Sequence, residues 1–274
     1  MVKFETKYFI RKMSTSLILI ILNTLFFSLA SAQQVLVPDD KGFVSTLNKY
    51  GWMSTKPDPI SLEFIEFAKN SSKPLLDIGG AYGYMSKLAI ENGATVILND
   101  TDQRHLDTAL QNLPSDLRKR LIIKKGKFPE ELNFLDNSID AVLARRVFHF
   151  LSGKELEVGV RKIYRWLTPG GKVFVFAATP YRQFSQEYIK GYEQKKKTDQ
   201  YPGEVQDSTK FVSAEEIANT PKFFHFLDID VLTKLFKDAG FIIETAEYLK
   251  IDEVPDHLKL DGRENIGIIA VKPQ

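Results

Sequence analysis

The chain has 274 residues, of which 43% are hydrophobic and 26% are charged, an ordinary globular composition with enough residues for one full α/β core. It contains no cysteine, which excludes disulfides, cysteine-based zinc sites and thiol catalysis. The formal net charge is +2, and the first 32 residues contribute +3 of it. The remainder therefore carries −1 and gives no argument for binding nucleic acid.

The first 32 residues are predicted to be a signal peptide. A basic stretch precedes an apolar run from Leu17 to Ala30, which is short for a membrane span. Ala30 and Ala32 give the small-residue spacing that signal peptidase reads, so cleavage is expected before Gln33. We expect export to the periplasm or secretion, without stable membrane association after cleavage. An uncleaved membrane anchor is the alternative.

Residues 33–274 are expected to form the folded domain, in which apolar strands alternate with amphipathic helices. Helices are predicted at 57–70, 84–93, 103–113, 153–167 and 228–241, and strands at 74–79, 94–99, 121–126, 138–144, 172–179, 241–249 and 265–273. This order predicts an α/β fold with a doubly wound, mostly parallel seven-stranded sheet. The connection before the last strand is too irregular for a crossover helix, so that strand is predicted to be antiparallel.

The alternation is interrupted at about residues 181–227, where we expect a helical cap inserted into the domain. Insertions of this length in compact domains are often functional. Aromatic residues here and before the first long strand are candidates for a lid and a substrate pocket, and ordinary packing of a cap is the alternative for each of them. They are Tyr50, Trp52, Tyr181, Phe184, Tyr188, Tyr192 and Tyr201.

The segment "LLDIGGAYG" follows a strand directly with a glycine-rich turn and a helix, an arrangement that lets a ligand approach bare backbone. Gly79, Gly80 and Gly83 miss the G-x-G-x-x-G spacing of dinucleotide sites. Asp77 lies two residues before the first glycine, where a carboxylate would repel a pyrophosphate. A ligand that carries an ammonium and a sulfonium would be attracted.

This segment resembles the first motif of the class I S-adenosylmethionine-dependent methyltransferases. Three further features resemble the same family: Asp100 at the end of the second long strand, "FLDNSIDAVLARRVFHFL" around the fourth, and "LTPGGKVFVFAATP" leading into the fifth. The resemblance covers about residues 73–180 and 228–273. It implies the Rossmann-like methyltransferase fold, S-adenosylmethionine as cofactor and transfer of its methyl group to an acceptor.

The resemblance also implies roles for individual residues. Asp77 is expected to orient the methionine amino group, the three glycines to make room for the methionine moiety, and Asp100 to accept the ribose hydroxyls. Phe128 is expected to lie against the adenine or, equally, to pack in the core, and Arg145 to contribute backbone near the cofactor. The chain departs from the motif at two positions. Ala81 replaces the usual middle glycine, a substitution that is tolerable if the φ of Ala81 is negative. Lys127 stands where the family often has an acid that reaches the adenine.

His149 is the candidate general base for a hydroxyl acceptor, with packing beside the cofactor as the alternative. No metal site is predicted, because the histidines are scattered. The aromatic content favours a small-molecule acceptor, whose identity the sequence leaves open, as it does the oligomeric state. A non-catalytic secreted binding protein and, less favoured, an NAD-dependent oxidoreductase are the alternative functions.

Overall fold

The computed structural model describes residues 37–183, 186–211, 217–250 and 256–274. The predicted signal peptide and Phe184 lie outside these ranges. Contacts between Cα atoms divide the chain into residues 1–37 and a compact unit, Pro38–Gln274, and the description below concerns this unit alone. In the described residues, no helix is both long enough and apolar enough to cross a membrane.

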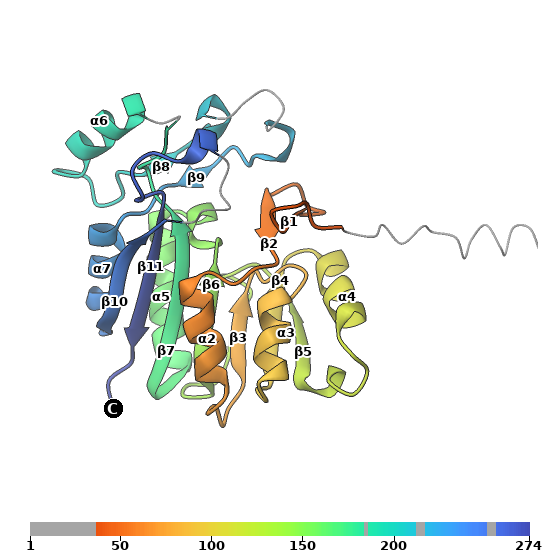
Figure 1. Cartoon of the computed structure of the whole chain (residues 1–274). Coiled ribbons are helices and arrows are strands. Elements are labelled where there is room, and N and C mark those ends of the chain that lie inside the picture. The colour runs from red at the N-terminus through yellow and green to blue at the C-terminus, as the bar shows by residue number, and fades with distance from the viewer. Residues whose placement is uncertain (1–36, 184–185, 212–216, 251–255) are drawn as a thin grey trace, which may run out of the picture. The chain divides into compact units, whose positions relative to one another are not determined.

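A seven-stranded sheet forms the centre of the unit, with the order β10-β11-β7-β6-β3-β4-β5 (Figure 1). The five strands from β7 to β5 in this order are parallel, and β11 runs antiparallel to both β7 and β10. The predicted sheet and its antiparallel last strand are confirmed. The strands are β3 (Leu75–Ile78), β4 (Val96–Asp100), β5 (Leu121–Lys125), β6 (Ile139–Arg145), β7 (Leu167–Ala178), β10 (Ile242–Leu249) and β11 (Asn265–Val271).

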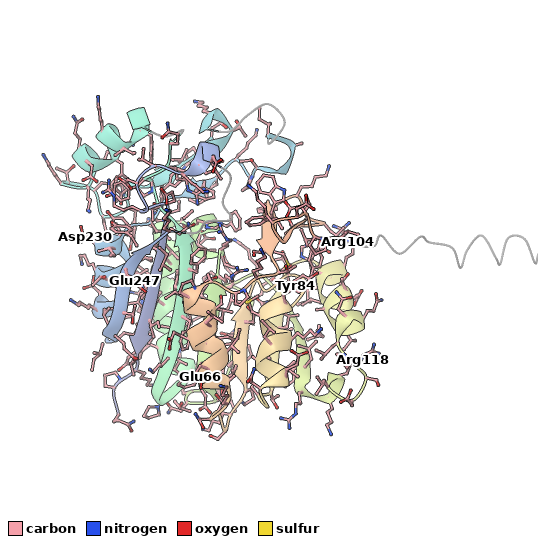
Figure 2. All side chains as sticks on the ribbon, viewed as in Figure 1. Glu66, Tyr84, Arg104, Arg118, Asp230 and Glu247 are labelled. Atoms are coloured by element: carbon pink, nitrogen blue, oxygen red, sulfur yellow. The ribbon has the colours of Figure 1, made fainter. Side chains whose placement is uncertain are left out.

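Helices cover both faces of the sheet (Figure 1). One face carries α2 (Pro59–Ala68), α3 (Tyr84–Glu91) and α4 (Gln103–Asn112), and the other carries α5 (Gly153–Trp166) and α7 (Ile229–Asp238). Their apolar stripes pack on strands whose side chains alternate between the two faces, which makes a two-layered core. Charged side chains such as Glu66, Arg118 and Asp230 project from the outer surfaces (Figure 2).

Local capping residues fix where the helices begin. Asp102 accepts a hydrogen bond from the backbone N–H of Arg104 and caps α4, as the sequence predicts. Ser152 and Glu155 form a capping box at the start of α5. The Pro-Gly-Gly turn is part of β7 and does not precede it, because Leu167 pairs with Ile139 before the register shifts and pairing resumes at Lys172.

Two small hairpin-like sheets flank the main sheet. β1 (Phe43–Ser45) pairs with β2 (Trp52–Ser54) ahead of α2, and β8 (Glu204–Val205) pairs with β9 (Phe224–His225) in the cap. In the chain, the cap follows β7 and precedes α7. Besides β8 and β9 it contains α6 (Gln186–Lys195) and the short helices Ser208–Phe211 and Ile217–Asn219. Both small sheets lie beyond the carboxyl ends of the parallel strands, where α/β proteins bind ligands (Figure 1).

Candidate active site

The glycine turn after β3 has no room for side chains. Gly79 has a φ of +61°, and a Cβ there would lie 2.6 Å from Val147. A Cβ at Gly80 would lie 2.5 Å from a carboxylate oxygen of Asp77. The two glycines therefore bring bare backbone to the mouth of the sheet, as expected for a turn that receives a ligand.

Asp77 is buried at the carboxyl end of β3, with 2% of its surface exposed. The Ser86 hydroxyl donates a hydrogen bond of 2.7 Å to its Oδ2. Burial raises the pKa of Asp77 to about 6, against the opposing influence of Ser86 and Arg145. A buried carboxylate with so little local compensation is typical of a group that receives a cation from a ligand.

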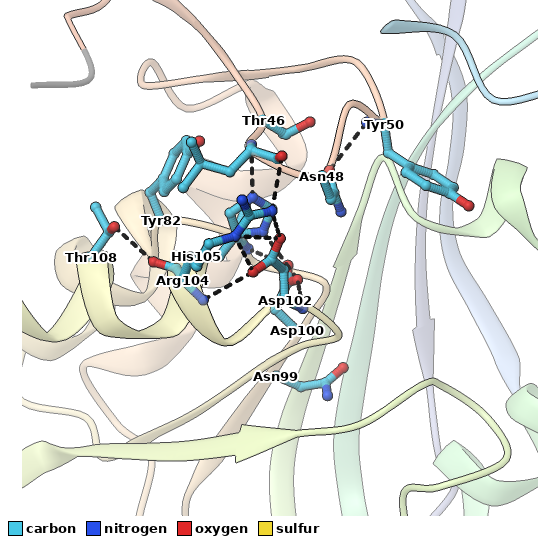
Figure 3. Close-up of polar contacts among 12 residues, drawn as sticks. Thr46, Asn48, Tyr50, Tyr82, Asn99, Asp100, Asp102, Arg104, His105 and Thr108 are labelled. Atoms are coloured by element: carbon cyan, nitrogen blue, oxygen red, sulfur yellow. Dashed lines mark hydrogen bonds and ion pairs between the residues drawn. The ribbon is translucent and has the colours of Figure 1, made fainter. Parts of the chain in front are cut away.

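Asp100 ends β4 and is the centre of a polar network (Figure 3). Its Oδ2 accepts the Ala81 N–H at 3.1 Å, and its Oδ1 accepts the Asp102 N–H at 2.8 Å and lies 3.1 Å from Nδ1 of His105. The Nε2 of His105 faces the N–H of Leu47 at 3.0 Å and must accept from it. Nδ1 therefore carries the hydrogen and donates to Asp100, so the network fixes the tautomer of the ring and the orientation of the carboxylate.

Ala81 has a φ of +46°, so the condition under which the substitution would be tolerable, a negative φ, is not met. The left-handed conformation directs the N–H of Ala81 to the Asp100 carboxylate. A glycine would adopt the same conformation without steric cost. For alanine the same conformation costs about 1 kcal/mol. The turn keeps the geometry of the glycine motif despite the substitution.

Three side chains hold the loop between β1 and β2 over the ends of β3 and β4 (Figure 3). The Tyr82 hydroxyl donates to the Ser45 carbonyl at 2.8 Å, and Arg104 donates to the Leu47 carbonyl at 3.0 Å. His105 accepts from the Leu47 N–H, as described above. The loop thus becomes a wall of the site, although it precedes the nucleotide-binding unit in the chain.

These elements enclose a cavity of about 630 Å³. Its walls come from the glycine turn, the ends of β4, β5 and β6, the β1–β2 loop and one residue of the cap. They include Thr46, Asn48, Tyr50, Trp52, Met53, Asp77, Gly79, Gly80, Asn99, Asp100, His105, Lys127, Phe128, Arg145, Arg146, Phe150, Glu155 and Phe223. The volume is typical of a pocket for small molecules.

The cavity brings together most of the residues expected to bind the cofactor, but not Gly83. That residue caps α3 with a φ of +69°, packs against Ala109 and Leu98 and lies outside the cavity lining. Its positive φ and its close contacts with Ala109 of α4 and Leu98 of β4 favour glycine at this position. The contact of Gly83 with the methionine moiety stays a prediction.

Arg145 lines the cavity, and its side chain pins the preceding segment to the sheet. Its Nε donates to Asp58 at 2.6 Å, and its two terminal nitrogens donate to the carbonyls of Ser54 and Lys56 at 3.0 Å each. This pairing lowers the pKa of Asp58 in opposition to burial. The side chain acts as a structural tie between β6 and the start of α2.

Phe128 contributes to the cavity wall, while its ring points into the core. It is 4% exposed, stacks on Phe148 at 6.4 Å between ring centroids, and occupies the space that a Cβ on Gly159 would need. Of the two interpretations of Phe128, the geometry favours packing. Its contact with an adenine stays a prediction.

His149 is buried, lies outside the cavity lining and stacks on Phe224 with 4.6 Å between ring centroids. Burial, followed by Arg146 and Arg182, lowers the pKa of His149 well below its usual value. The lowered pKa favours the neutral ring, which packs between Phe150 and Phe224. This placement favours the packing interpretation, and the general-base role stays a prediction.

The turn after β5 is organised by side chains that the motif did not indicate. The Asn99 amide donates to the carbonyls of Lys124 and Gly126 at 2.9 and 2.8 Å. Lys127 forms ion pairs of 2.9 Å with Glu130 and Glu155, which raise its pKa. Lys127, at the position where the family often has an acid, is thus paired with an acid of α5, and both residues line the cavity.

The predicted aromatic residues of the pocket divide between the two segments. Tyr50 and Trp52 line the cavity. Tyr181, Tyr188, Tyr192 and Tyr201 do not; Tyr181 and Tyr192 pack inside the cap, and Tyr201 donates to Glu157 on α5 at 2.6 Å. For these four residues the geometry favours the packing alternative, and a role in a lid stays a prediction.

Asn99, His105 and Arg146 also line the cavity, and none of them was predicted to be a site residue. His105 lies five residues after Asp100, on the first turn of the following helix, and that spacing could have indicated that its side chain reaches Asp100.

Within the described residues, no group of three or more His, Cys, Asp or Glu side chains could hold a metal ion.

Comparisons with known proteins agree with this geometry. Residues 76–175 match the model of a family described as "Methyltransferase domain". A solved S-adenosylmethionine-dependent methyltransferase from Mesorhizobium loti has 15% identity, covers 77% of this chain and 97% of its own, and superposes with a TM-score of 0.58, a likeness of fold.

Two curated relatives are also similar. An uncharacterized methyltransferase from Geobacillus sp. (strain WCH70) is 25% identical over 185 residues, which are 64% of this chain and 73% of the relative. Phosphoethanolamine N-methyltransferase 1 of Triticum aestivum is 27% identical over 107 residues, which are 38% of this chain and only 21% of the wheat protein. The chain thus contains a segment that matches a methyltransferase-domain family, and its fold is similar to that of solved S-adenosylmethionine-dependent methyltransferases.

Proposed function

We propose that the protein binds S-adenosylmethionine in the cavity described above and transfers the methyl group to a small-molecule acceptor. The observation that carries this proposal is the pair of buried carboxylates, Asp77 and Asp100, which end neighbouring strands beside a bare glycine turn and face one cavity. Asp77 would hold the ammonium, and Asp100 the ribose hydroxyls. A dinucleotide is disfavoured because its pyrophosphate would meet the Asp77 carboxylate.

When bound, S-adenosylmethionine supplies an electrophilic methyl group on a sulfonium, which is a good leaving group. The chain's own contribution is then mainly positioning and exclusion of water. The β1–β2 loop, held by Tyr82, Arg104 and His105, covers the cavity from one side, and Phe223 of the cap contributes to its wall. This enclosure, together with the cavity volume, supports a small acceptor. The wheat relative, by its name, acts on phosphoethanolamine.

An assay of S-adenosylhomocysteine release tests this function. The acceptor source is a cell extract divided by ultrafiltration into small molecules and macromolecules. We expect release with the small-molecule fraction and none with Asp77→Asn, while a surface variant, Arg161→Gln, remains active. Release that depends only on the macromolecular fraction would contradict the small-acceptor proposal.

We also propose that the protein is exported, on the composition of its first 32 residues. Expression of the full chain in a secreting host should give an extracytoplasmic product that begins at Gln33, as N-terminal sequencing would show. An intact product that sediments with membranes would support the anchor instead.

A further inference from the structure

Arg145, the last residue of β6, and Arg146, which follows it, both line the cavity, and they differ in how their charges are compensated. Arg145 pairs with Asp58 and donates to two carbonyls. Arg146 has no ion pair and no hydrogen bond from its guanidinium to any residue in the described parts of the chain, and its Nε is buried without a partner. Its cationic carbon lies 4.8 Å over the ring of Phe176, and the residue lines the cavity.

The backbone also holds Arg146 in an unfavourable state. Its φ is +57°, a left-handed conformation that favours glycine, and its N–H donates to the Phe176 carbonyl at 2.7 Å. Burial, followed by the charges of Arg145 and Arg182, lowers the pKa of Arg146 to about 9. Arg146 thus combines a partly buried cation, which has no ion pair within the described residues, with a strained backbone. Such costs persist where function requires them.

The position of Arg146 indicates which ligand it serves. The expected cofactor contacts are Asp77 on β3 and Asp100 on β4, whereas Arg146 stacks on β7, on the opposite side of β6. Tyr50 and Phe150, whose rings meet edge to face with 5.5 Å between their centroids, line the same cavity.

We propose that Arg146 binds a carboxylate or phosphate group of the methyl acceptor, so that the substrate is a small anion with an apolar body. This inference rests on the proposed function. A guanidinium is suited to both groups, because it can donate two parallel hydrogen bonds to them. The cofactor also carries a carboxylate, on its methionine moiety, and the test must separate these two sources.

The test is a titration of benzoate, phenyl phosphate and the neutral isostere benzamide, each with and without S-adenosylhomocysteine. Binding is followed by calorimetry and by the Arg146 Nε–Hε signal in nitrogen-15 NMR. The variant is Arg146→Gly, because glycine accepts the positive φ and should leave the fold intact. Arg161→Gln, on the exposed surface of α5, is the matched control.

We expect at least one of the two anions to shift the Arg146 signal and to bind the wild type about tenfold or more tightly than Arg146→Gly, a difference of about 1.4 kcal/mol. Benzamide should not distinguish the two proteins, and both should bind S-adenosylhomocysteine equally well. The absence of any anion-dependent shift at millimolar concentrations would overturn the proposal.

A loss of S-adenosylhomocysteine affinity in Arg146→Gly, with 5′-methylthioadenosine unaffected, would assign the residue to the cofactor carboxylate and also overturn the proposal. Failure of the wild type to bind S-adenosylhomocysteine would instead contradict the proposed function. The anion titration without S-adenosylhomocysteine tests Arg146 by itself, so it separates a failure of the anion site from a failure of the proposed function.

Discussion

Replacement of Asp77 by asparagine should stabilise the fold while it removes cofactor binding. Burial raises the pKa of this carboxyl from an ordinary value of 3.8 to about 6, a difference of about two units. Each unit corresponds to about 1.4 kcal/mol, so ionised Asp77 costs the folded state about 3 kcal/mol at neutral pH. Asparagine carries no charge, and its amide oxygen can still accept the hydrogen bond from Ser86.

The sign of the pH dependence follows from the raised pKa. The stability that protonated Asp77 contributes is fully present below pH 3.8 and is lost as the pH rises through about 6. Urea unfolding of the ligand-free proteins should therefore show Asp77→Asn to be about 3 kcal/mol more stable than the wild type above pH 7, with the gap closing towards pH 4. Calorimetry at neutral pH should show that the variant no longer binds S-adenosylhomocysteine.

A variant that is less stable than the wild type at neutral pH would refute this reasoning, as would a gain in stability that does not change with pH. Ser86→Ala is the matched control, because it removes the hydrogen bond and keeps the carboxyl. It should destabilise the protein at neutral pH, where the carboxylate loses its local donor.

Three further outcomes follow from the same site. Affinity for S-adenosylhomocysteine should fall by up to about tenfold per unit as the pH drops below about 6, because Asp77 must ionise to bind an ammonium, and calorimetry across pH checks this. His105→Leu should weaken cofactor binding about tenfold and cost about 1–3 kcal/mol of stability, because Leu47 and Asp100 lose their hydrogen-bond partner. Thr108→Ala, on α4, is the control. An unchanged cofactor affinity of His105→Leu would show that the network does not orient the site. Ala81→Gly should gain about 0.5–1 kcal/mol in urea unfolding and keep cofactor binding, and a loss of stability would mean that its φ is unstrained.

The sheet could be predicted from the sequence because its determinants are local. Short apolar strands, amphipathic helices and glycine punctuation set the order of the elements, and the irregular connection after β10 indicated the antiparallel β11. Asp77 and Asp100 could be placed because each lies at the end of a strand, and parallel strands bring their carboxyl ends to one edge.

Other features depend on tertiary contacts that no local pattern encodes. The β1–β2 hairpin has three-residue strands without clear alternation, and it becomes a wall of the site only through Tyr82, Arg104 and His105. Tyr181 and Tyr192 pack against each other within the cap, and Tyr201 is held by Glu157 of α5. Arg145 and Arg146 are equivalent in sequence, and only the position of Asp58 distinguishes the paired arginine from the one without a partner among the described residues.

The most direct test of the account is a calorimetric titration of residues 33–274 with S-adenosylmethionine, S-adenosylhomocysteine and NAD, with Asp100→Ala as the site variant. The account predicts micromolar binding of the first two ligands, no binding of NAD, and loss of binding in the variant, because Asp100 would hold the ribose hydroxyls. Binding of NAD, or failure of the folded wild type to bind either sulfur-containing ligand, would contradict it.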